Sequence, residues 1–182
     1  MTRRGGTGVG LAFVLLGAAG LPALVAQRAA PTATRPGAAA EAFLSTLDAG
    51  QRSKALLPLT DKTRVVWSNL PTGSKMQVGA TERNGLKLGD MTPPQEKAAL
   101  ALLSATLSAE GYEKALAVVG ADQALEDQSA PKRAPTQAVR FGRAEYYLAI
   151  LGKASTTGTW MLQFGGHHLA INVTFAGRQQ VL

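Results

Sequence analysis

Two segments near the C-terminus alternate apolar and other residues with a period of two. Their apolar positions are Trp160, Leu162 and Phe164 in the first segment and Leu169, Ile171, Val173 and Phe175 in the second. A period of two is typical of antiparallel strands that bury one face of a sheet. Residues 146–151 form a third strand candidate. The last part of the chain is therefore predicted to form an antiparallel sheet.

Helices are predicted before these strands. Residues 38–47 carry an apolar face at helical spacing, and Asp48 can cap a second short helix that continues to Leu57. A further helix is expected over 112–125. Because helices come first and strands afterwards, the sequence predicts an α+β fold, with N-terminal helices followed by antiparallel strands in a single domain.

The clearest helix start is the stretch Thr92-Pro93-Pro94-Gln95. Thr92 is the expected N-cap, Pro93 takes the first helical position, and Gln95 completes a capping box. We expect this helix to end at Gly111, because glycine favours helix C-termini.

Residues 63–67 suit a short strand, and turn chemistry follows at 69–73. Aromatic residues make up only 5% of the chain, so the two tryptophans have structural value as large buried side chains. We therefore expect Trp67 and Trp160 to be core anchors rather than stacking platforms for sugars.

The first 26 residues follow the order of a secretory signal peptide. Arg3 and Arg4 form a positive start, an uncharged apolar stretch follows, and Pro22 precedes small residues that end near Ala26. This order predicts export, and therefore a secreted or periplasmic protein. The alternative is an uncleaved membrane anchor, since the apolar stretch nearly reaches the ~20 residues that a membrane span needs.

The sequence divides into three parts. Residues 1–26 are the predicted signal peptide, residues 27–37 are a flexible lead-in rich in Ala, Pro and Thr, and residues 38–182 form one domain. Residues 179–182 lie within a strand-like segment. A sheet that stops there has an unpaired edge, which indicates a truncated domain.

The charge of the chain argues against nucleic acid as a partner. The formal net charge is +7, but the densest basic stretch lies in a predicted loop without interleaved aromatic residues; it comprises Lys132, Arg133, Arg140 and Arg143. The excess is compatible with a solvated surface or with a small-molecule or anionic ligand. Membrane contact is expected only through an uncleaved N-terminus. The chain has no cysteine, which excludes disulfides, thiolate metal sites and a cysteine nucleophile.

An ordered set of short motifs runs through the domain. In chain order it comprises Trp67 with Pro71, Arg83-Asn84-Gly85-Leu86, Gln95 with Leu102-Leu103, Leu107-Ser108-x-x-Gly111-Tyr112, Tyr147 near Gly152, and Trp160 followed by Gly166-His167-His168-Leu169. With these motifs the chain resembles an uncharacterised, mostly secreted family, catalogued as domain of unknown function 3500. Its members are usually longer, so the resemblance covers their N-terminal half. The resemblance implies no reaction and no catalytic residues.

His167 and His168 are the only histidines of the chain, and two adjacent histidines suggest a metal site. On a strand, however, neighbouring side chains point to opposite faces. Both rings can meet one ion only if the strand is bulged or has not yet begun, and Gly165-Gly166 makes this feasible. A divalent metal ion bound by His167 and His168 is therefore one hypothesis.

A second hypothesis places His168, Asn172 and Thr174 in one exposed pocket, since they share strand parity. His168 would be a general base or a single metal ligand, and Asn172 would orient the substrate. Arg83, before the turn signal Asn84-Gly85, could bind a carboxylate or phosphate near the histidines. The nearest candidates for a carboxylate partner are Glu145, Asp90 and Glu82.

The bland alternative is that His167 is a satisfied core residue and that His168 packs against an aromatic ring. Common hydrolase signatures such as Gly-x-Ser-x-Gly and His-Glu-x-x-His are absent from the sequence. The first functional hypothesis is an exported hydrolase-like or lyase-like enzyme with a histidine-centred site. A non-catalytic periplasmic or extracellular binding module and an inactive truncated paralogue are the alternatives.

Overall fold

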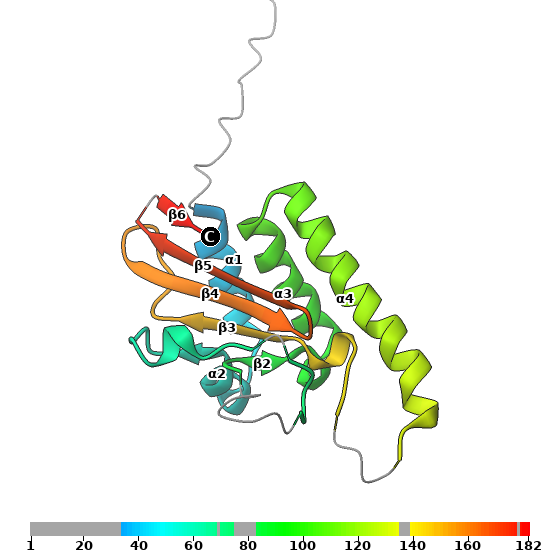
Figure 1. Cartoon of the computed structure of the whole chain (residues 1–182). Helices are drawn as coiled ribbons and strands as arrows, with labels where there is room; N and C mark the ends of the chain where they lie inside the picture. Colours follow the sequence, from blue (N-terminus) through cyan, green and yellow to red (C-terminus); the bar gives the residue numbers. More distant parts are fainter. Residues whose placement is uncertain (1–33, 69, 75–82, 135–138, 178) are drawn as a thin grey trace, which may run out of the picture.

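The structure is a computed structural model that describes residues 34–68, 70–74, 83–134, 139–177 and 179–182 (Figure 1). The predicted signal peptide, most of the predicted lead-in and Glu82 lie outside these residues. No helix in the described ranges has both the length and the apolar character that crossing a membrane requires.

The described part of the chain contains four α-helices and six strands. The helices are α1 (Thr34–Ser45), α2 (Ala49–Ala55), α3 (Pro93–Thr106) and α4 (Ala109–Ser129). The strands are β1 (Leu56–Leu57), β2 (Leu86–Lys87), β3 (Tyr147–Leu151), β4 (Thr159–Gly166), β5 (Leu169–Ala176) and β6 (Gln179–Val181). Because the helices and the sheet form one hydrophobic core, the predicted single α+β fold is confirmed.

The strands form one sheet in the order β1-β3-β4-β5-β6, and β2 also pairs with β3. The pairs from β3 to β6 are antiparallel, as the alternating sequence predicts. The pair between β1 and β3 is parallel, so the sheet is mixed. Leu56 and Leu57, expected at the end of a helix, leave α2 after Ala55 and pair with the end of β3 instead.

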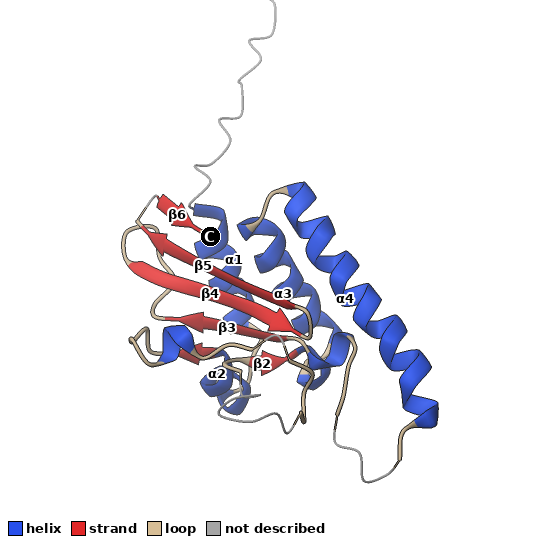
Figure 2. Ribbon diagram, in the orientation of Figure 1, coloured by secondary structure: helices blue, strands red, loops and turns tan. Residues whose placement is uncertain are grey.

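One face of the sheet packs on α1 and α3, and α4 lies beside α3 (Figure 2). Trp160 is 0% exposed and stacks on Phe175 with 4.1 Å between ring centroids, so its expected role as a core anchor is confirmed. Trp67, in contrast, is 50% exposed, and the expectation that it is buried was wrong.

The segment that carries Trp67 is not a strand. A 3₁₀ turn at Thr63–Val65 replaces the expected extended backbone. The carbonyl oxygens of Thr63 and Arg64 accept hydrogen bonds from Asn84 Nδ2 at 2.7 Å and Gln163 Nε2 at 3.1 Å. Side chains therefore satisfy backbone groups that a strand would have paired with a neighbour. The segment lies across the face of the sheet opposite the helices, here called the outer face.

Helix α3 begins as predicted, and the side chain of Gln95 accepts a hydrogen bond from the backbone N–H of Thr92 at 2.9 Å. It ends at Thr106, before the glycine expected to stop it. Ser108 caps α4 instead by accepting a hydrogen bond from the Gly111 N–H at 3.1 Å. Gly111 thus lies in the first turn of α4, which is longer than the predicted helix at both ends.

Candidate metal site at the β4–β5 turn

The two histidines form the turn between β4 and β5. Gly166 at the end of β4 pairs with Leu169 at the start of β5, so His167 and His168 lie outside both strands. The strict alternation of side chains does not apply to them, and one of the two conditions for a shared ion is met.

His168 has a left-handed backbone, with φ of 61°, and is the one non-glycine residue in the described ranges with a positive φ. Histidine tolerates this region better than most residues, but still at a cost relative to glycine. Strained positions of this kind are concentrated at functional sites.

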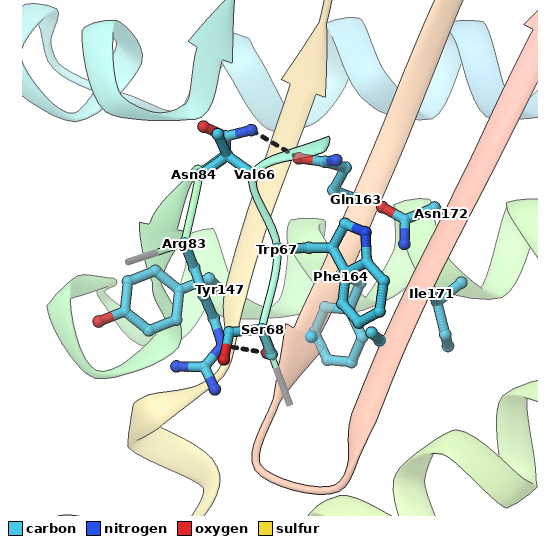
Figure 3. A pocket seen from close by; sticks show the side chains of 12 residues that line it. Val66, Trp67, Ser68, Arg83, Asn84, Tyr147, Gln163, Phe164, Ile171 and Asn172 are labelled. Carbon is cyan, nitrogen blue, oxygen red and sulfur yellow. Dashed lines mark hydrogen bonds between the residues drawn. The ribbon is translucent and has the colours of Figure 1, made fainter. Parts of the chain in front are cut away.

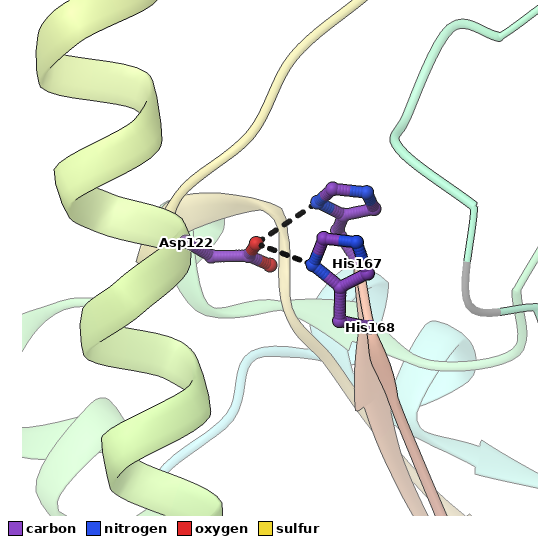
Figure 4. A group of neighbouring side chains, drawn as sticks. All are labelled: Asp122, His167 and His168. Carbon is purple, nitrogen blue, oxygen red and sulfur yellow. Dashed lines mark hydrogen bonds and ion pairs between the residues drawn. The ribbon is translucent and has the colours of Figure 1, made fainter.

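Both imidazole rings turn toward one carboxylate on α4 (Figure 4). Nδ1 of His167 lies 2.9 Å from Oδ1 of Asp122, and Nδ1 of His168 lies 3.4 Å from the same oxygen. The two ring centroids are 3.4 Å apart. Residues that are 45 positions apart in the sequence therefore meet at one point.

Tyr146 holds the other oxygen of this carboxylate. Its hydroxyl lies 2.9 Å from Oδ2 of Asp122 and 2.8 Å from the backbone carbonyl oxygen of His167, so it can donate to either. Burial, and then the hydrogen bond to Asp122, raise the pKa of Tyr146 well above the usual tyrosine value. The phenol therefore stays neutral and remains a hydrogen-bond donor.

Gly166 explains why Tyr146 can reach this position. A Cβ atom added to Gly166 would lie 2.7 Å from the Tyr146 ring, which is closer than carbon atoms can approach. The ring thus packs directly against the backbone of β4, next to the histidine turn. The glycine before the two histidines serves the placement of the tyrosine.

The site is closed around Asp122 and open at His168. The exposed fractions of the side chains are 2% for Asp122, 12% for His167 and 64% for His168. Phe141 covers His167 with 5.0 Å between the ring centroids. A ligand can therefore approach along His168, while the carboxylate is shielded from solvent.

The three side chains fit a divalent transition metal. One ligand atom from each of Asp122, His167 and His168 lies within 4.8 Å of the other two. In tetrahedral zinc sites with bonds of about 2.0–2.1 Å, ligand atoms are about 3.3–3.4 Å apart. The measured separations of 2.9 and 3.4 Å are close to this value. Two imidazole nitrogens and a carboxylate oxygen suit zinc and similar ions.

Without an ion, the same atoms form a hydrogen-bonded pair of a carboxylate and an imidazole. Asp122 then orients His167 through Nδ1, as a carboxylate orients the general base in a catalytic triad. The other ring nitrogen, Nε2, would be free to accept a proton. The arrangement can thus serve either metal binding or general base catalysis.

Arg83 is committed to a loop rather than to the histidines. Its guanidinium donates to the carbonyl oxygens of Ser68, at 2.7 Å, and Leu70, and it stacks over the ring of Tyr147. Burial lowers the pKa of Arg83, although the charge of Asp122 is close enough to oppose this shift slightly. Its predicted role in binding an anion has no contact with either histidine to support it.

The expected grouping of His168 with Asn172 and Thr174 is not found. Asn172 lies in a pocket on the outer face of the sheet, whereas Thr174 borders a separate depression. His168 does not share their face because strand parity ends at the turn. Any catalytic role of Asn172 stays a prediction.

The predicted carboxylate partners are elsewhere. Glu145 pairs with Lys87 at 3.6 Å, and Asp90 lies in an exposed 3₁₀ turn. The sequence analysis overlooked Asp122, although a signal was present. Asp122 continues the buried stripe of α4, three residues after Val119 and seven after Ala115. A carboxylate on an apolar face needs partners, which makes it a site candidate.

Comparison with known families gives one match. The model of a family described as protein of unknown function (DUF3500) matches residues 30–182. The matched range includes Asp122, Tyr146 and both histidines. No curated protein and no solved structure matches the chain.

Proposed function

The chain belongs to the DUF3500 family, and on this premise we propose that it is an exported hydrolase-like or lyase-like enzyme with a metal site formed by Asp122, His167 and His168. One observation carries the proposal: both imidazole Nδ1 atoms face the same buried carboxylate oxygen. Export rests on the N-terminal sequence, with its arginine pair, apolar centre and small residues.

A divalent ion in this site would supply Lewis-acid activation of water or of a carbonyl group. Asp122 contributes the negative charge, and its burial strengthens its attraction for a cation. Tyr146 fixes the orientation of the carboxylate, as outer hydrogen bonds do in known metal sites. His168 is exposed and leaves an approach for the substrate.

The number of ligands favours catalysis over a structural role. Structural zinc sites are closed by four protein ligands, whereas catalytic sites have three and keep one position open. Within the described ranges the group has three members, two histidines and one aspartate. A binding module without turnover remains the alternative function, and it would use the same three side chains.

Zinc titration by calorimetry tests the proposal, with Asp122→Asn as the variant and Asp127→Asn as the matched control. Asp127 lies on the same helix, and its side chain bonds to Gln123 rather than to the histidines. Asparagine keeps the shape of aspartate but loses the charge. We expect one zinc ion per chain in the wild type and the control, and at least 100-fold weaker binding in Asp122→Asn.

A wild-type protein that takes up no stoichiometric zinc, or an Asp122→Asn variant that binds like the wild type, would contradict the metal site. Catalysis is tested separately with chromogenic ester, phosphoester and glycoside substrates. The proposal expects turnover that a chelator removes and that zinc restores. Zinc binding without turnover on any substrate would favour the binding module.

A further inference from the structure

A second candidate site lies on the outer face of the sheet, away from the helices (Figure 3). It is bordered by the segment 66–68, by Arg83 and Asn84, and by residues of β3, β4 and β5. The enclosed space is about 20 Å³. This is enough for one water-sized group, such as a hydroxyl. A ligand can therefore insert one small group and must keep the rest of its body outside.

The side chain of Trp67 forms the mouth of this pocket and is 50% exposed. In Figure 3 it extends over β4 toward β5, beside Asn172 and Ile171. An indole that is half exposed costs free energy, because its apolar surface stays in contact with water. Exposed aromatic rings beside a polar pocket are common in ligand sites.

Two of the three amides around the pocket are already used. Asn84 Nδ2 donates to Gln163 Oε1 at 2.8 Å and to the carbonyl oxygen of Thr63 at 2.7 Å. Gln163 Nε2 donates to the carbonyl oxygen of Arg64 at 3.1 Å. These bonds fasten the segment that carries Trp67 onto the sheet. The position of the indole is thus fixed before any ligand arrives.

The third amide, on Asn172, has an unpaired acceptor. Its Oδ1 atom is buried and has no hydrogen-bond partner, although Asn172 lies directly opposite Gln163 in the strand register. Buried polar atoms are nearly always paired, because an unpaired one costs about 1–3 kcal/mol. The pocket therefore favours a ligand that brings a hydrogen-bond donor.

The ligand is expected to be neutral. The lining contains no carboxylate, so an ammonium group would enter without a counter-charge. Its single cation, Arg83, directs its donors to the loop at 68–72, which leaves little attraction for an anion. A neutral donor of the size of one water molecule is a hydroxyl group.

We propose that this pocket binds a neutral saccharide, with one hydroxyl group donating to Asn172 Oδ1 and the sugar ring lying against the Trp67 indole. The C–H face of a pyranose is apolar and matches an exposed indole, while its hydroxyls both donate and accept hydrogen bonds. A flat nucleobase could also stack on Trp67, but its edge is too broad for the enclosed space.

The pocket is close to the histidine turn. Gly165 and Ala170 line it, and each lies two residues from a histidine. Two residues of a strand span about 7 Å. An oligosaccharide held at Trp67 could therefore extend to His168. Saccharide binding does not need the metal ion, whereas the identification of the saccharide as substrate rests on the proposed function.

Calorimetric titration with cellohexaose, laminarihexaose, xylohexaose and chitohexaose tests this proposal. We expect saturable binding of at least one of them, weakened at least tenfold by Trp67→Ala and by Asn172→Ala. Val65→Ala is the matched control, because Val65 is exposed on the same segment but does not line the pocket. The control should bind like the wild type.

Binding of none of these sugars at millimolar concentration would overturn the proposal, as would equal binding by both pocket variants. Stronger binding of adenosine than of any sugar would assign the pocket to flat aromatic ligands instead. Zinc uptake, measured on the same variants, should be unchanged. Loss of sugar binding with intact zinc uptake therefore separates this site from the metal site.

Discussion

At the scale of single residues, Asp122 organises the candidate site. A carboxylate that is 2% exposed is stable only if its oxygens are hydrogen-bonded or bind a cation. Here the hydroxyl of Tyr146 faces one oxygen and the ring nitrogens of His167 and His168 face the other. The same contacts that make the buried charge tolerable also bring three metal-ligand side chains together.

The left-handed backbone of His168 gives a prediction in which stability and binding change in opposite directions. Glycine adopts φ of 61° without strain, so His168→Gly should raise the free energy of unfolding of the metal-free protein by about 0.5–1 kcal/mol. Zinc affinity should fall at least tenfold, because a ligand is lost. Urea denaturation and zinc titration measure the two effects. A variant that is less stable and binds zinc normally would contradict both expectations.

Tyr146 should affect the metal site without being a ligand. Tyr146→Phe removes the hydroxyl that faces Asp122 Oδ2 and keeps the ring. Loss of such an outer hydrogen bond typically lowers metal affinity about 10–100-fold. Competition with a chromophoric chelator measures this, with Tyr112→Phe, near the start of α4, as the control. Unchanged zinc affinity in Tyr146→Phe would show that the carboxylate needs no such support.

At the scale of elements, the site depends on how the β4–β5 turn meets the middle of α4. The turn brings both histidines out of the strands, and the buried stripe of α4 turns Asp122 toward them. The far end of α4 is fastened by another carboxylate, Glu126. It pairs with Arg133 and accepts the Phe141 N–H at 3.0 Å, which holds the loop whose aromatic ring covers His167.

Glu126 gives a prediction for the pH dependence of stability. The hydrogen bond from Arg133 holds the pKa of Glu126 below the usual glutamate value, although burial opposes this. A lowered folded-state pKa stabilises the protein above the unfolded-state pKa, and this contribution is lost as the pH falls through the folded-state value. Glu126→Gln should therefore be less stable than the wild type near neutral pH, and the difference should shrink in acid.

Urea denaturation from pH 7 to pH 3 checks this expectation. Glu110→Gln is the matched control, since Glu110 forms an exposed pair with Lys114 on the same helix and should change little. A stability difference between wild type and Glu126→Gln that is constant across this range would contradict the coupling to Arg133.

Local patterns predicted those elements that local chemistry decides. The alternation around Trp160 and the capping signals at Thr92 identified β4, β5 and the start of α3. The segment 63–67 was assigned wrongly, because distant amides, such as Gln163, satisfy its carbonyl groups. Asp122 was overlooked for a similar reason: its pairing with His167 is a tertiary contact that sequence spacing does not encode.

At the scale of the whole molecule, the sheet separates two polar sites. The histidine turn lies at one end of the sheet against α4, and the amide pocket lies on the outer face, where α1 and α3 do not reach. A single sheet thus positions a charged group and a neutral pocket about two residues apart along β4 and β5. This proximity is what joins the proposed metal site to the proposed saccharide.

The metal site is the central claim, and X-ray absorption spectroscopy at the zinc edge tests it most directly. The account predicts a zinc-loaded protein with two imidazole nitrogens and a carboxylate oxygen as protein ligands, at about 2.0–2.2 Å. The imidazole signature should be lost in a variant in which both His167 and His168 are replaced. A first shell of oxygen atoms alone, or an unchanged spectrum in that double variant, would contradict the account.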